Sequence, residues 1–440
     1  MALNGLERLQ AEIADLGAVH PVGRVFEVGK GTIEVSGLTT RATLGDRARI
    51  HAQSGPVFGA EVIALRRGAV TLLADCAVEG VAIGDRVEVL GQAGIAPDDS
   101  WIGRIVDPFG RPLDGRPLLR GGHDRNIRAT PPPAAFRRRL GERVETGLDA
   151  FNTLLPLVRG QRIGLFAGSG VGKSSLLAKF AKGVAADVVV IALIGERGRE
   201  LREFVEKTLG PEGMARSVIV AATSDQSPLV RRRCGWAAMT VAEYFRDQGK
   251  HVLFLADSVT RFAEAHREVA LAAGEPPSLR GYPPSTSHQI MSLAERSGPG
   301  MEGAGDITAV FSVLVAGSDM EEPVADILRG TLDGHVVLDR GIAERGRFPA
   351  IDLLRSVSRS LPEAATPAEN ELIAKARKLL GAYDRAEMMI QAGLYAAGSD
   401  PVIDAAIKVW PALDGFLARD AADGTRSSFS RLSLALAAAG

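Results

Sequence analysis

The stretch that decides the fold is Leu165-Phe166-Ala167-Gly168-Ser169-Gly170-Val171-Gly172-Lys173-Ser174. It follows the G-x-x-x-x-G-K-[ST] spacing at every position but the first, where Ala167 replaces glycine. An apolar run over 162–167 precedes the glycines and a helical pattern over 174–181 follows them, so they join a predicted strand to a predicted helix. The backbone N–H groups of such a loop, with the positive end of the helix dipole, can surround the oxygens of a phosphate chain.

Side chains in and beside this loop predict a nucleotide bound together with Mg²⁺. The ammonium of Lys173 can reach the terminal phosphates, and the hydroxyl of Ser174 can hold the metal. An ordinary glycine turn is the alternative, and the strand and helix on either side argue against it. The residues expected to contact the nucleotide are Gly168, Ser169, Gly170, Val171, Gly172, Lys173, Ser174 and Ser175.

Two further apolar runs each lead into a carboxylate. Val252–Ala256 is followed by Asp257, which can polarise Mg²⁺ or its water shell. Val188–Ile194 is followed, after one glycine, by Glu196, which can orient and activate an attacking water. Because ligands bind at the carboxyl ends of parallel strands, we expect both acids to face the phosphate loop. A solvated charge cluster that opens a helix is the alternative interpretation of the segment around Glu196.

Composition and charge limit the classes of protein. The 440 residues correspond to two to four domains, at about 100–200 residues per domain. Lys and Arg number 52 against 53 Asp and Glu, and the net charge of −1 argues against a broad basic surface for nucleic acid. Cys76 and Cys234 match no zinc spacing and suit a reducing compartment. Charged residues interrupt the first residues where a signal peptide needs an apolar stretch, and no apolar run reaches about 20 residues, so we expect a cytoplasmic protein that reaches a membrane only through partners.

The pattern of apolar residues divides the chain into four segments. Residues 1–20 place five leucine and isoleucine side chains on one helix face, which predicts either a docking helix or a helix packed on its own domain. Residues 21–95 contain short β-prone runs between glycine turns and predict a small β-barrel. Residues 96–362 alternate apolar strands with helical stretches and predict an α/β domain with a parallel sheet. Residues 363–440 predict a C-terminal helical domain.

Finer expectations concern the α/β segment. A connector over 107–140, rich in proline and arginine, is expected to be ordered because apolar residues recur through it. Helices are expected over 199–209 and 233–246, each after an apolar strand.

Several motifs together resemble one family. Besides the phosphate loop they are Gly195–Glu200, Asp257–Phe262, Gly281–Pro284, Phe348–Asp352 and the pair Ser358-Arg359. They resemble the catalytic subunits of rotary-type ATPases, and in particular the flagellum-specific branch of the type III protein-export ATPases. The phosphate loop and the segment 333–347 resemble that branch more than the proton-pumping synthases. The similarity covers nearly the whole chain, from the barrel to the C-terminal helices.

The resemblance implies a role for five side chains, with ATP and Mg²⁺ as ligands. Glu196 matches the catalytic glutamate of the family, and Arg197 and Arg261 match arginines near the phosphates. Phe348 matches an aromatic residue that stacks on adenine. Arg359 matches the arginine finger, which the family inserts into the site of the next subunit. Without the resemblance, the sequence predicts only that Arg359 is a surface arginine and that Phe348 is a core residue before a proline.

The resemblance also implies an assembly and a set of partners. Since the phosphate loop, Glu196 and Arg359 lie on one chain, identical subunits can complete one another's sites in a homohexameric ring. The loop over 275–282 resembles one that meets a central stalk, and residues 1–18 occupy the place where the branch docks a stator-like regulator. The implied function is ATP hydrolysis that energises protein export at the cytoplasmic face of the inner membrane, with an export gate, chaperones and cargo proteins as further partners.

Four alternatives remain open at this stage. A virulence-type export ATPase and the catalytic subunit of a proton-translocating ATPase share the chemistry, although the C-terminal segment lacks an acidic rotor-contact run. An RNA-translocating ring helicase is disfavoured by the near-neutral charge and by a predicted barrel with few aromatic residues. A non-catalytic nucleotide-binding scaffold is disfavoured by Glu196, because such subunits carry a non-acidic residue there.

Overall fold

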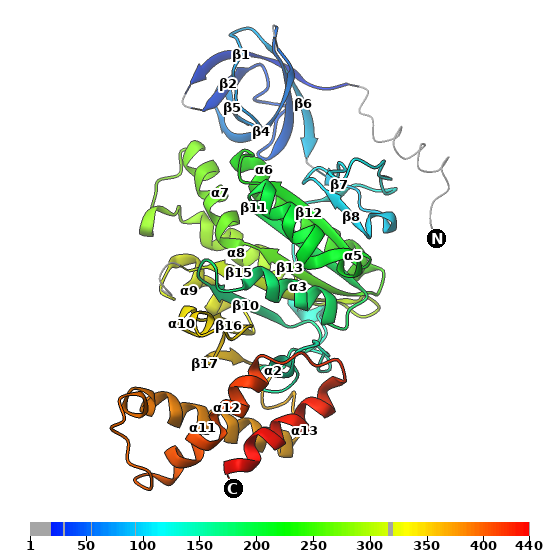
Figure 1. Cartoon of the computed structure of the whole chain (residues 1–440). Coiled ribbons are helices and arrows are strands. Elements are labelled where there is room, and N and C mark those ends of the chain that lie inside the picture. Colours follow the sequence, from blue (N-terminus) through cyan, green and yellow to red (C-terminus); the bar gives the residue numbers. More distant parts are fainter. Residues whose placement is uncertain (1–18, 30, 54, 93, 316–319, 440) are drawn as a thin grey trace.

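The computed structural model describes residues 19–439 except 30, 54, 93 and 316–319. Figure 1 shows three regions stacked along the molecule: a barrel at one end, a large sheet flanked by helices in the middle, and a group of helices at the other end. The predicted order of a β-barrel, a parallel-sheet domain and C-terminal helices is thereby confirmed. The helix predicted within residues 1–20 lies almost wholly outside the described residues.

The N-terminal region is a closed six-stranded barrel. Its strands pair in the order β1-β2-β5-β4-β3-β6, and their inward side chains form a separate apolar core that includes Ile33, Val35, Ile50 and Leu72. Strand β3 is not apparent in the sequence, because charged residues alternate with Ala48 and Ile50 along it. The strands are β1 Val22–Gly29, β2 Thr32–Ser36, β3 Asp46–His51, β4 Val57–Arg66, β5 Ala69–Ala74 and β6 Arg86–Gln92.

The central region is built on one large sheet. Its strands lie in the order β17-β16-β10-β15-β13-β11-β12-β8, all parallel except that β17 runs antiparallel to β16 and the short β14 runs antiparallel to β15. Apolar side chains cover both faces, as expected of strands buried between helices. The strands are β8 Arg104–Val106, β10 Arg162–Ala167, β11 Val188–Glu196, β12 Ser217–Thr223, β13 His251–Asp257, β14 Gly298–Pro299, β15 Asp306–Leu314, β16 Gly334–Leu338 and β17 Ile351–Ser358.

The helices of this region differ in two places from those expected. α6 (Pro228–Asp247) begins five residues before the predicted start, because Ser227 accepts from Val230 N and Pro228 follows as the first helical residue. The helix expected over 199–209 is divided into α4 (Gly198–Glu203) and a π-helical turn over Phe204–Leu209. The other helices are α2 Asp149–Asn152, α3 Lys173–Gly183, α5 Gly210–Met214, α7 Val259–Ala272, α8 Ser285–Glu295, α9 Pro323–Thr331 and α10 Arg340–Glu344.

The connector over 107–140 is ordered and lies against the sheet domain. It contributes the short β9 (Arg125–Asn126), which pairs with β7 (Gly94–Ile95). Arg128 from this connector and Arg232 from α6 both bind the buried Glu61 carboxylate of the barrel. Because a buried carboxylate needs a paired cation, this three-residue cluster fixes the barrel to the sheet domain.

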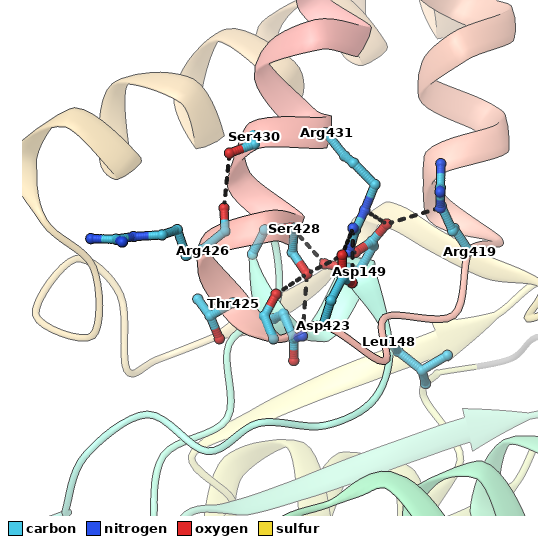
Figure 2. A network of polar contacts seen from close by, with 12 residues as sticks. Leu148, Asp149, Arg419, Asp423, Thr425, Arg426, Ser428, Ser430 and Arg431 are labelled. Carbon is cyan, nitrogen blue, oxygen red and sulfur yellow. Dashed lines mark hydrogen bonds and ion pairs between the residues drawn. The ribbon is translucent and has the colours of Figure 1, made fainter.

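The C-terminal region consists of α11 (Pro367–Gln391), α12 (Pro401–Leu417) and α13 (Gly424–Leu436). Figure 2 shows how α13 is attached: Arg431 donates to both oxygens of the fully buried Asp149 in α2, at 2.8 and 2.5 Å. The same guanidinium donates to Asp423. The helical region is therefore joined to the sheet domain by the buried ion pair between Arg431 and Asp149 as well as by apolar packing. Among the described residues, no helix is long and apolar enough to cross a membrane.

Candidate active site

The phosphate loop lies between the carboxyl end of β10 and the first turn of α3. Gly170 and Gly172 have φ of +78° and +88°, a conformation that side-chain-bearing residues rarely adopt. No side chain caps the N-terminus of α3, so its first amides are available to an anion. All the predicted loop residues except Val171 line one cavity, and the Val171 side chain is buried in the core. Val171 can therefore contact a nucleotide only through its backbone.

Lys173, which lines this cavity, forms an ion pair with the buried Asp257. The ammonium of Lys173 donates to the Asp257 carboxylate, which is 3% exposed. Ser312 Oγ on β15 donates to the same carboxylate oxygen at 2.9 Å. Ser312 was not predicted from sequence; the only indication is a hydroxyl within the apolar run of β15. The strand ends thus bring together the cation that the sequence predicts to bind the phosphates and the acid that it predicts to hold the metal.

Glu196 ends β11, the strand next to β13, and lines the same cavity of about 810 Å³. Burial raises the pKa of the Glu196 carboxyl to about 7, the nearby Asp257 carboxylate adds to the rise, and the Lys173 ammonium opposes it. By contrast, the hydrogen bond from Arg197 lowers the pKa of the neighbouring Glu200. A carboxylate with a pKa near neutrality is suited to accept a proton from an attacking water.

This pKa predicts a pH dependence for the reaction. Only the ionised form of Glu196 can act as a base, and about a tenth of it is ionised at pH 6 but about nine tenths at pH 8. We therefore expect kcat/KM for MgATP to rise about tenfold between pH 6 and 8, with a midpoint near 7. Initial rates across this range measure it. A flat profile, or one that falls with increasing pH, would contradict the role of Glu196 as a base.

Three arginines line the cavity. Arg261 on α7 donates to Glu264 at 3.0 Å, and Arg197 donates to Glu200 at 2.7 Å. Arg231 on α6 lines the same cavity and was not predicted from sequence, because it lies in an arginine run, Arg231-Arg232-Arg233, with no motif of its own. Glu200 and Glu264 hold the guanidinium groups of Arg197 and Arg261 beside the space where phosphate oxygens would lie, and a phosphate can replace these acids as the arginine partner.

Phe348 lies against the phosphate loop. Its ring is half exposed, and a Cβ atom added to Gly172 would stand 3.0 Å from Phe348 Cδ1. Gly172 is therefore required for two reasons: its φ is left-handed, and a side chain there would compete with the Phe348 ring for space. An exposed aromatic face beside the loop suits stacking on a nucleotide base.

The structure places Arg359 far from the cavity. Its backbone N–H donates to Asp333 O, and Asp333 Oδ2 accepts from Arg162 N at the start of β10. The phosphate loop follows the other end of β10, about 17 Å away at about 3.3 Å per residue. An arginine side chain cannot extend that far, so Arg359 cannot serve the site of its own chain.

The oxygen donors present fit Mg²⁺ bound together with a phosphate chain. Ser174, which lines the cavity, and Asp257, which pairs with Lys173, are hard oxygen donors, and Mg²⁺ prefers such donors together with water and substrate phosphates. Among the described residues there is no cluster of three or more His, Cys, Asp or Glu side chains that could hold a metal ion without a phosphate.

Comparison with known proteins identifies the family. A model of the nucleotide-binding domain of the ATP synthase alpha/beta family matches residues 147–358, and a model of the T3SS EscN ATPase C-terminal domain matches residues 365–435. The flagellum-specific ATP synthase of Caulobacter vibrioides is 45% identical over 427 residues, which cover 95% of this chain and 96% of that protein. The chain belongs to the flagellum-specific ATP synthase family. It is an ATPase of that family, as the resemblance had predicted.

Another relative and two solved structures support the same family assignment. The flagellum-specific ATP synthase of Salmonella typhimurium is 42% identical, and the match covers 94% of this chain and 93% of that protein. The assembled ATPase EscN of the enteropathogenic E. coli type III secretion system superposes with a TM-score of 0.87 at 37% identity, covering 94% of this chain and all of EscN. A second structure shows EscN in complex with its central stalk EscO, with a TM-score of 0.84.

Proposed function

We propose that this chain hydrolyses MgATP at the interfaces of a homohexameric ring and thereby energises flagellar type III protein export at the cytoplasmic face of the inner membrane. The observation that carries the proposal is that Lys173 and Glu196 line one cavity at the carboxyl edge of the sheet, where Asp257 pairs with Lys173 and the pKa of Glu196 is raised to about 7. The names of the relatives support the flagellar system, and the likeness to EscN makes a virulence-type type III secretion ATPase the second candidate.

In this proposal the residues have separate tasks. The amides of residues 168–174 and the Lys173 ammonium bind the phosphates. Ser174 and, through water, Asp257 would hold Mg²⁺, which would neutralise developing charge on the phosphates. Glu196 takes a proton from the attacking water, and Arg197 and Arg261 bind phosphate oxygens. Phe348 stacks on adenine.

Replacing Lys173 with alanine tests the proposal in the native host. We expect the purified variant to lose MgATP affinity by at least about tenfold, because a charge-assisted contact to phosphate contributes more than about 1.4 kcal/mol in a cavity of this kind. Cells carrying it should stop exporting flagellar filament protein into the medium. Lys179→Ala is the matched control, since Lys179 lies on the same helix and pairs with the exposed Asp420. Normal filament export with loss of another secreted protein set would favour the virulence system.

Partner contacts form a separate part of the proposal. The loop over 275–282 joins α7 to α8, and Glu275 binds the N–H and hydroxyl of Ser285 at 2.8 and 2.6 Å. Residues 276–278 and 280 are exposed beyond this anchored base, which suits contact with a central stalk. Residues 1–18, which lie outside the described residues, are proposed to dock a stator-like regulator, and the export gate, chaperones and cargo complete the set of partners.

Deletion of residues 1–18 should abolish capture of the regulator in a pull-down from the native host. Basal ATP hydrolysis should persist, because every proposed site residue lies beyond residue 160. Retained capture would place the regulator contact elsewhere on the chain.

A further inference from the structure

The turn that carries Phe348 is closed by the guanidinium of the residue before it. Arg347 Nη1 donates to Pro349 O at 3.0 Å, and Nη2 donates to Ile351 O at 2.8 Å. Arg347, Pro349 and Ile351 are all buried, so these carbonyls have little access to water. Because a planar guanidinium holds two acceptors in a fixed relative position, Arg347 sets the path of the backbone on both sides of Phe348.

The third polar contact of Arg347 comes from the C-terminal helices. Asp414 on α12 places Oδ1 3.0 Å from Arg347 Nε. Burial lowers the pKa of Arg347, and the Asp414 carboxylate opposes that shift. A buried cation needs such compensation, so the orientation of Arg347 depends on a residue that is 67 positions away in sequence and in another region of the fold.

A neighbouring pair, Arg345 and Glu387, also joins this turn to α11, at 2.8 Å. The Arg345 side chain is 48% exposed, and ion pairs exposed to that degree contribute little to stability. The Arg347–Asp414 pair is better shielded from water, because the side chain of Arg347 is only 8% exposed and that of Asp414 is 31% exposed.

We propose that Arg347 and Asp414 are positioning residues for the nucleotide base: the ion pair from α12 orients Arg347, Arg347 closes the turn, and the turn holds the Phe348 ring against Gly172 of the phosphate loop. This inference rests on the proposed stacking of Phe348 on adenine. It assigns the C-terminal helices a part in ATP affinity, although neither Arg347 nor Asp414 lines the phosphate cavity.

The test compares the steady-state kinetics of Asp414→Asn and Arg347→Lys with those of the unchanged protein. Since residues in contact couple by about 0.5–3 kcal/mol, we expect KM for ATP to rise about three- to tenfold, with kcat within about twofold. Asp423→Asn is the matched control, because it removes an aspartate that pairs with an arginine elsewhere in the C-terminal region (Figure 2) and should leave KM unchanged. Thermal unfolding of each variant checks that the fold is kept.

A double variant separates positioning from a merely structural role. If Asp414 acts through the ring, Asp414→Asn should add nothing to KM in a chain that already carries Phe348→Ala. The inference is overturned if Asp414→Asn raises KM by its full factor in that background, if it lowers kcat as much as kcat/KM, or if it leaves KM unchanged while Phe348→Ala raises it. A Phe348→Ala variant with unchanged KM would overturn the stacking role itself, whatever Asp414 does. The tests of ATP hydrolysis with the Lys173 and Glu196 variants do not depend on that result.

Discussion

Glu196→Gln should lower kcat for ATP hydrolysis by about 10²–10⁴-fold and leave MgATP binding nearly unchanged. Glutamine keeps the shape of the side chain but cannot take a proton from water at neutral pH. Single-turnover hydrolysis together with equilibrium binding of MgATP measures the two effects separately. Normal turnover in this variant would move the catalytic base to another residue.

The structure offers a matched control and a check of the fold. Glu200→Gln changes another glutamate of the same cavity, but Arg197 holds the pKa of Glu200 low, so it is a poor proton acceptor and its loss should change kcat only slightly. Because the folded-state pKa of Glu196 is raised, its ionised form opposes folding above the unfolded-state value and most strongly above pH 7. Glu196→Gln should therefore be at least as stable as the unchanged chain at pH 8, so a loss of rate cannot come from unfolding.

Arg359→Ala should lower kcat by about 10³–10⁵-fold and spare nucleotide binding, as in phosphoryl-transfer systems that use an arginine in trans. The physical reason is its place at the opposite edge of the sheet from its own phosphate loop, from which it can reach only the site of a neighbouring copy. Arg340→Ala, which removes an arginine that is 79% exposed, is the control and should leave kcat unchanged.

Mixing two inactive variants tests the role of Arg359 in trans. A site built from an Arg359→Ala subunit and a Lys173→Ala neighbour can combine an intact Lys173 with an intact Arg359. In randomly mixed rings with equal amounts of both variants, about a quarter of the sites would be intact, and about a quarter of the unchanged activity should return. Activity no higher than the sum of the separate variants would show that Arg359 does not complete a neighbouring site.

Much of the fold could be predicted because its signals are local. The alternation of apolar strands with helices predicted the parallel sheet, and the glycines before Lys173 predicted the turn between β10 and α3. Strand β3 and the early start of α6 were not predicted. In β3 the inward residues are only Ala48 and Ile50 among charges, and in α6 a run of arginines hides the apolar face.

The sequence by itself determined the chemistry of the phosphate loop and of the carboxylates at the strand ends. The reason is that these features depend on residues close together in the chain: the glycines at 170 and 172 allow the left-handed backbone, and the apolar runs of β11 and β13 cause their burial. Only the tertiary structure decided which distant groups meet there. Ser312 reaches Asp257 because β13 and β15 are adjacent, and Arg359 is kept from its own site because β17 runs antiparallel. Such contacts depend on strand order and direction, and no spacing along the chain encodes either one.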